Sequence, residues 1–137
     1  MGDRCYLQVT VHPSDVDKFC EIAGLDPDDF TDSPGDPYTS QVEEANYALH
    51  DELNEAAAEG CRFTGWHTSG DDYPGMEFVG YAGDYLDCAA VASVGLVVRF
   101  DAETGEAYPH TIADARRFVA AAKACESEIR AAIESRT

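Results

Sequence analysis

The sequence predicts an α+β fold: a mostly antiparallel sheet of about four strands with three helices packed on one face. Two observations predict it. Short segments of alternating or β-branched apolar residues are distinct from longer segments whose apolar residues recur every three or four positions. The strand-like segments are also grouped rather than interleaved with helices, in the order β-α-α-β-β-β-α, which is typical of α+β proteins. At 137 residues the chain is expected to form a single domain, residues 1–137.

The first part of the chain predicts a strand, a helix and a long loop. Residues 4–11, RCYLQVTV, alternate as a half-buried strand does. Residues 14–23 place apolar side chains on one helical face, and Gly24 is a natural stop. Residues 25–40, LDPDDFTDSPGDPYTS, hold three prolines and five aspartates, which predicts a Pro/Asp-rich loop.

The stretch VEEANYALHDELNEAAAEG, residues 42–60, predicts a second helix over about 41–59. Its apolar residues fall at helical spacing: Val42, Ala45, Leu49, Leu53 and Ala56. The stretch carries six carboxylates and neither Lys nor Arg. Like charges four residues apart destabilise a helix by a few tenths of a kcal/mol. The question is therefore whether these acids form a solvated face or are directed at a positive partner.

The second half of the chain predicts strands followed by one long helix. Residues 61–67 and 76–83 are expected to form a hairpin, and residues 94–100, VGLVVRF, a further strand. Residues 84–93 are ambiguous, with 84–87 as a candidate helical turn. From Thr111, apolar positions recur at helical spacing to about residue 135, and Thr111 with Asp114 forms a capping-box pattern.

The net charge of −18 is concentrated in the middle of the chain. Residues 19–98 hold seventeen acids and a single base, Arg62, whereas the final segment is close to neutral. A salt-adapted protein is also acidic, but such adaptation is expected to acidify the whole surface. The uneven distribution therefore favours a localised negative surface.

Several functional classes are disfavoured by the sequence. No phosphate-binding glycine loop or nucleophile elbow is present, so nucleotide chemistry and enzymatic activity are not expected. No apolar run approaches a membrane span, and residues 1–9 lack a signal-peptide layout, so we expect a cytoplasmic protein. The five cysteines lack close pairs, which predicts reduced, buried thiols rather than a metal site; no cofactor is expected.

An acidic surface with aromatic anchors predicts an interaction protein that meets a basic surface of a nucleic-acid-binding protein and does not itself bind nucleic acid. The candidate partner-binding residues are Glu43, Glu44, Asp51, Glu52, Glu55, Glu59, Trp66, Asp71, Asp72 and Tyr73. A rival hypothesis is a small-molecule or metal-binding, enzyme-like domain around residues 66–73, with His67, Asp71 and Asp72 at its centre. A third is a housekeeping protein with a solvated acidic face.

The stretches EEANYALHDELNEAAAEG and FTGWHTSGDDY together resemble small acidic proteins of phages and prophages. This resemblance covers about forty residues and contains no catalytic motif. It implies an inhibitor of a host defence complex, of the anti-CRISPR class, that acts in the host cytoplasm. The run of carboxylates adds the expectation that this inhibitor competes as a nucleic-acid mimic. Under the same resemblance, the housekeeping alternative is a phage protein. The resemblance assigns no specific binding residue.

Overall fold

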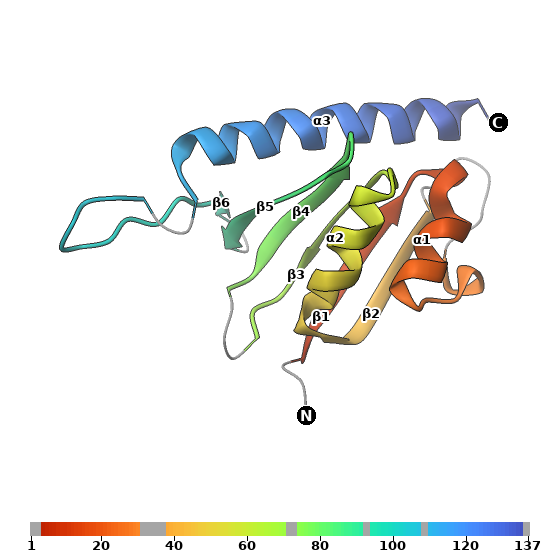
Figure 1. Ribbon diagram of the computed structural model, residues 1–137, viewed down its shortest axis with the longest axis horizontal. Coiled ribbons are helices and arrows are strands. Elements are labelled where there is room, and N and C mark those ends of the chain that lie inside the picture. The colour runs from red at the N-terminus through yellow and green to blue at the C-terminus, as the bar shows by residue number, and fades with distance from the viewer. Residues whose placement is uncertain (1–3, 31–37, 71–73, 92–93, 108–109, 136–137) are drawn as a thin grey trace.

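The computed structural model describes residues 4–30, 38–70, 74–91, 94–107 and 110–135. Its centre is a six-stranded antiparallel sheet in the order β2-β1-β3-β4-β5-β6. The α+β class, the three helices and the antiparallel sheet are as predicted. The predicted strand count and element order are wrong, because β2 and β5 form where a helix and an ambiguous segment were expected (Figure 1).

The elements follow one another from the N-terminus in a simple order. Strand β1 spans Arg4–Val11, α1 spans Val16–Ala23, β2 spans Tyr38–Asn46 and α2 spans His50–Ala58. Strands β3, β4, β5 and β6 span Phe63–His67, Met76–Tyr81, Asp84–Val91 and Gly95–Leu96. The last helix, α3, spans Ile112–Glu134. Three short helical turns, η1 to η3, cover Pro13–Asp15, Pro27–Asp29 and Tyr47–Leu49.

The helices cover both faces of the sheet, so the prediction of three helices on one face is wrong. Adjacent residues of β4 divide between two cores: Phe78 packs with α1 and α2, while Val79 packs with α3. Because successive strand residues point to opposite faces, α3 lies across the sheet from α1 and α2. Figure 1 shows α1 and α2 side by side against one face of the sheet, with α3 running along the top of the view.

Two cores hold these layers together. The larger one, under α1 and α2, is built from fully buried residues of β1, β3 and β4 and of both helices, among them Leu7, Val9, Phe19, Leu53 and Phe63. The smaller one joins β4 and β5 to α3. All five cysteines are buried and free, as the sequence predicts. Within the described residues, no helix is long and apolar enough to cross a membrane.

The predicted helix over 41–59 is wrong in its first half. Residues up to Asn46 belong to the edge strand β2, which is paired with β1. The register of this pair shifts between Cys5 and Leu7, where Leu7 faces Val42 but Cys5 faces Ala45. This bulge puts one extra residue into β2 and spaces the inward side chains of Val42 and Ala45 three residues apart. The irregular strand therefore imitates the spacing of a helix.

Other boundaries confirm or correct the sequence reading. Strand β1 matches its predicted range, and α3 begins with the predicted capping box between Thr111 and Asp114. Gly24 ends α1 in the left-handed conformation, as expected of a helix stop. Residues 84–87 form the start of a strand rather than a helical turn. The strand predicted over 94–100 is only two residues long.

Candidate functional site

A left-handed turn joins β2 to α2. Tyr47, Ala48 and Leu49 all have positive φ, at 51°, 55° and 54°. The left-handed conformation costs a residue with a side chain about 1–2 kcal/mol, and non-glycine residues adopt it singly in most proteins. Three in a row are therefore a local strain that the rest of the fold must hold in place.

The core holds this turn. Ala48 is buried at 5% exposure and Leu49 packs against the core under α1 and α2. Tyr47 is in contrast 53% exposed, although large apolar side chains are favoured inside. The buried pair thus fixes the backbone, and the fixed backbone presents the Tyr47 ring at the surface.

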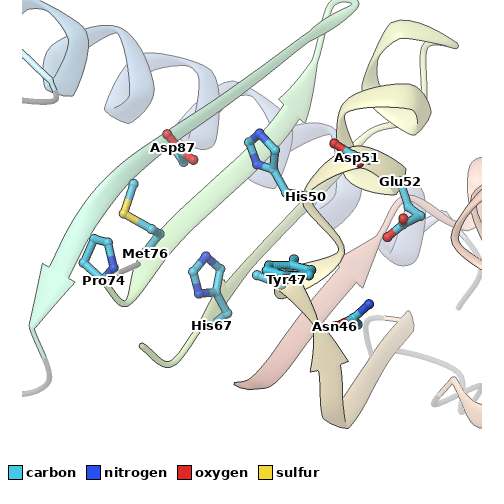
Figure 2. A pocket seen from close by; sticks show the side chains of 10 residues that line it. Asn46, Tyr47, His50, Asp51, Glu52, His67, Pro74, Met76 and Asp87 are labelled. Carbon is cyan, nitrogen blue, oxygen red and sulfur yellow. The ribbon is translucent and has the colours of Figure 1, made fainter. Parts of the chain in front are cut away.

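A cavity of about 520 Å³ opens beside this turn, between the start of α2 and the ends of β3, β4 and β5. The side chains that line it come from four segments. They are Asn46, Tyr47, Ala48, His50, Asp51, Glu52, His67, Pro74, Met76 and Asp87. Figure 2 shows His50, Asp87, Met76, His67 and Tyr47 arranged around the opening. The cavity is within the size range of small-ligand pockets.

His67 forms part of the cavity wall and is 7% exposed. Its Nδ1 lies 2.9 Å from the carbonyl oxygen of Thr68. A carbonyl can only accept, so Nδ1 donates and the ring's lone pair is on Nε2 in the neutral form. Burial lowers the pKa of His67 below its usual 6.5, against a smaller opposing effect from Thr68 and Asp87. At neutral pH this imidazole is therefore uncharged.

Aromatic contacts support the cavity from below. The His67 ring stacks on Phe78, with centroids 6.3 Å apart, and Phe78 stacks on Tyr85 at 6.1 Å. His50 meets the edge of Tyr85 at 5.6 Å. Asp87, another residue of the cavity wall, is held by His110 in the segment before α3. The Asp87 Oδ1 atom lies 2.9 Å from the His110 Nε2 atom. These contacts fix the orientation of His50, of His67 and of the Asp87 carboxylate.

Negative charge is gathered on the outer surface of α1, η2 and α2, which we call the acidic layer (residues 16–30 and 50–60). These residues include nine acids and one base, Lys18. Eight of the nine acids are exposed and Glu52 is half-buried. The Lys18 Nζ atom lies 3.5 Å from a Glu59 carboxylate oxygen and also donates to the Glu59 carbonyl. The only base of the layer is thus engaged by one of its acids.

The opposite side of the sheet has a different charge. Helix α3, Ile112–Glu134, holds four acids and four bases and is neutral overall. Arg62, the single base of residues 19–98, is directed inward. It contacts Asp15 at 2.9 Å and Glu128 of α3 at 3.3 Å, with 29% of its side chain exposed. Arg62 therefore joins α3 to the sheet and contributes little positive charge to the surface.

The structure divides the predicted partner-binding residues into separate groups. Four lie together at α2: Asp51, Glu52 and Glu55 are in the helix, and Glu59 is the residue that follows its last turn as the C-cap. Glu43 and Glu44 are in the edge strand β2 instead of the helix, and Glu44 lies 4.0 Å from Arg4. The predicted helix over 41–59 would have placed these two acids on the same helix as the α2 acids, and that placement is therefore wrong.

Trp66 lies on the sheet face away from the acidic layer. It is 39% exposed and contacts the Tyr6 ring at 5.5 Å, and it lines a second cavity of about 770 Å³ near β5 and β6. The next residue along β3, His67, points to the other face and lines the cavity beside α2, although it also borders the second cavity. Trp66 and the α2 acids thus do not share one surface.

The predicted residues Asp71, Asp72 and Tyr73 lie outside the described residues, as does Asp32 of the Pro/Asp-rich loop. Of the three residues at the centre of the rival site, only His67 is described. Among the described residues there is no group of three or more His, Cys, Asp or Glu that is placed to hold a metal ion.

Sequence reasoning missed the cavity residues Tyr47, His50, Met76 and Asp87. Tyr47 was hidden within an apparent helical repeat, because positive φ in a non-glycine residue has no sequence signature. Met76 is in β4 and Asp87 is in β5, and the pairing of these two strands brings both residues to the cavity beside α2. Their convergence is a long-range property of the fold.

Comparisons of this chain with protein-family models, with curated proteins and with solved structures find no match.

Proposed function

We propose that this protein is a small acidic interaction protein that occupies a basic surface on a nucleic-acid-handling complex. A host defence complex, bound in the manner of an anti-CRISPR inhibitor, is the partner class that we favour. The observation that supports the proposal is the separation of charge by the sheet. The acidic layer has nine acids against one base, whereas α3 on the opposite side is balanced.

The physical basis is electrostatic complementarity. A concentrated negative field steers a basic partner toward one face and raises the association rate. The same field repels nucleic acid, whose phosphates need Lys or Arg. A competitor for a nucleic-acid site is therefore a better fit than a nucleic-acid binder. Adaptation to high salt explains the observation less well, because α3 would then be expected to carry the same excess of acids.

The test uses two variants that change the net charge by the same amount. The first reverses three exposed acids of the acidic layer that do not line the cavity: Glu21→Lys, Asp28→Lys and Glu55→Lys. The control reverses three exposed acids elsewhere: Glu103→Lys, Glu106→Lys and Glu126→Lys. Circular dichroism establishes that both are folded.

Proteins captured from a host lysate are identified, and their affinities for the two variants are measured at increasing salt. We expect a nucleic-acid-binding partner whose affinity falls with salt and drops on the order of tenfold or more in the acidic-layer variant alone. The wild type should also release labelled DNA from that partner. Equal affinities for both variants, or a partner that keeps its DNA, would contradict the proposal.

A further inference from the structure

The cavity beside the left-handed turn adjoins the acidic layer. Asp51 and Glu52, in the first turn of α2, belong to both surfaces. The rest of the cavity wall comes from the β2–α2 connection and from β3, β4 and β5. Figure 2 shows Asp51 and Glu52 near His50 and Tyr47 at the start of α2, so a partner that covers this end of the acidic layer also reaches the cavity.

The charges of the cavity select against anions. Its ionisable lining is Asp51, Glu52 and Asp87 with the imidazoles of His50 and His67, and the described lining includes neither Lys nor Arg. His67 is neutral at pH 7 because of its burial. Asp87 has a basic neighbour, because its Oδ1 atom lies 2.9 Å from the Nε2 atom of His110. Asp51 and Glu52 contribute the other carboxylates of the lining, and carboxylate oxygens are acceptors that suit a cationic donor.

The apolar part of the lining suits a slender stem. Tyr47, Ala48, Pro74 and Met76 contribute apolar surface, and the exposed Tyr47 ring stands at the opening. A cation over the face of a tyrosine ring is attracted by the ring quadrupole. A thioether adapts to irregular shapes. The combination of acids, aromatic ring and apolar wall fits a cation on an alkyl chain.

We propose that this cavity receives the guanidinium group of an arginine side chain from the basic partner, an inference that rests on the proposed function. A guanidinium is preferred to an ammonium because it is planar and weakly hydrated, stacks on aromatic faces and offers five donors. Its donors match the carboxylates of the α2 first turn, and its stem matches the apolar wall. The strained turn serves this purpose by holding Tyr47 at the opening.

The first experiment tests the chemistry with blocked amino acids. N-acetyl-arginine amide is titrated into the protein against N-acetyl-citrulline amide, which has the same shape without the charge. Nuclear magnetic resonance follows the His50 and His67 rings and the Met76 methyl group. We expect shifts at these groups with a dissociation constant on the order of 1 mM for arginine, and at least tenfold weaker binding of citrulline.

Matched variants locate the binding. Asp51→Asn with Glu52→Gln removes two charges that line the cavity, and Glu21→Gln with Glu55→Gln removes two from the same layer outside it. Arginine binding should fall at least fivefold in the first variant and less than twofold in the second. Tyr47→Asn, which suits positive φ, should also weaken binding while the protein stays folded.

The outcomes separate this inference from the proposed function. Equal binding of arginine and citrulline, or equal loss in both double variants, overturns the cation site and leaves the acidic layer's role intact. A second outcome is that arginine binds in the cavity but the Asp51→Asn, Glu52→Gln variant keeps its affinity for the partner. This outcome overturns the partner's side chain as the occupant and identifies a free small cation instead. Loss of both arginine and partner binding in the cavity variant supports the inference. Loss of partner binding only in the charge-reversal variant supports the proposed function alone.

Discussion

At the scale of single residues, burial decides which ionisable groups respond to pH. His12 and His67 are both buried, and burial is the main cause that lowers the pKa of each. Arg62 lowers the pKa of His12 further. Burial also raises the pKa of the Cys125 thiol to about 12, so that thiol stays protonated and unreactive. The buried histidines are therefore the groups through which mild acid should act.

We expect the free energy of unfolding to fall as the pH drops from 7 to 5. Below about 6.5 the unfolded chain binds protons at His12 and His67 that the folded rings resist, so acid favours unfolding until the lowered folded pKa is reached. Each histidine contributes a slope of up to about 1.4 kcal/mol per pH unit. Urea denaturation at several pH values measures this dependence of the free energy of unfolding on pH.

The matched variant for this prediction is His67→Gln, which keeps a polar side chain but does not titrate. Its stability should depend less steeply on pH between 5 and 7 than that of the wild type. Identical slopes for the two proteins would show that His67 is not held neutral by the fold.

At the scale of elements, two glycines leave room for large aromatic rings of the neighbouring strand. Gly65 faces Phe78 and Gly80 faces Phe63 in the register of β3 with β4. A Cβ added at Gly80 would lie 2.2 Å from the Phe63 ring, and at Gly65 2.2 Å from the Gln8 carbonyl oxygen. The two phenylalanine rings thus occupy the space above the glycines and fill the core under α1 and α2.

Gly80→Ala and Gly65→Ala should each destabilise the protein, by about 1–3 kcal/mol or more, because the core has no room for the methyl group. The atoms nearest to the added Cβ at Gly80 all belong to the Phe63 side chain, whereas at Gly65 the nearest is backbone. Adding Phe63→Leu to Gly80→Ala should therefore recover part of the loss. Adding Phe78→Leu to Gly65→Ala should recover less. Double-mutant cycles in urea measure both couplings, and equal couplings would contradict this account.

At the scale of the whole molecule, Arg62 joins the two sides of the sheet. Its backbone N–H and guanidinium donate to Asp15 beside α1, and its guanidinium also donates to Glu128 of α3. Tyr81 of β4 donates to the same Glu128 carboxylate, and this bond is the main cause that lowers the pKa of Glu128. The network fixes α3 on the face opposite the acidic layer.

Arg62→Met should lower the free energy of unfolding by about 2 kcal/mol, because it leaves the partly buried Asp15 without its guanidinium partner. Lys18→Met is the control: it removes an exposed ion pair with Glu59 and should cost less than about 1 kcal/mol. Chemical denaturation compares the two variants. Equal losses would mean that Arg62 acts only as a surface charge.

Much of the fold and part of the site follow from the sequence. Strand β1, helix α1 and helix α3 appear where local periodicity places them, because one covered face imposes a clear repeat. The apolar periodicity is lost in strands that do not have one covered face and a regular spacing. Strand β5 lies between α2 and α3, and with both faces covered its alternation is weak. Strand β2 was misread because its bulge copies a helical spacing.

The sequence by itself determined that this protein is acidic in its middle, holds reduced cysteines and combines an antiparallel sheet with three helices. Only the tertiary structure decided that the sheet separates an acidic layer from a neutral helix. It also decided that Tyr47, His67 and Asp87 meet around one cavity. The physical reason is that periodicity and composition report on the structure of a few neighbouring residues. Packing between distant segments decides which face each helix covers, and it forms the left-handed turn and the cavity. It also holds in place a local strain that no short stretch would adopt alone.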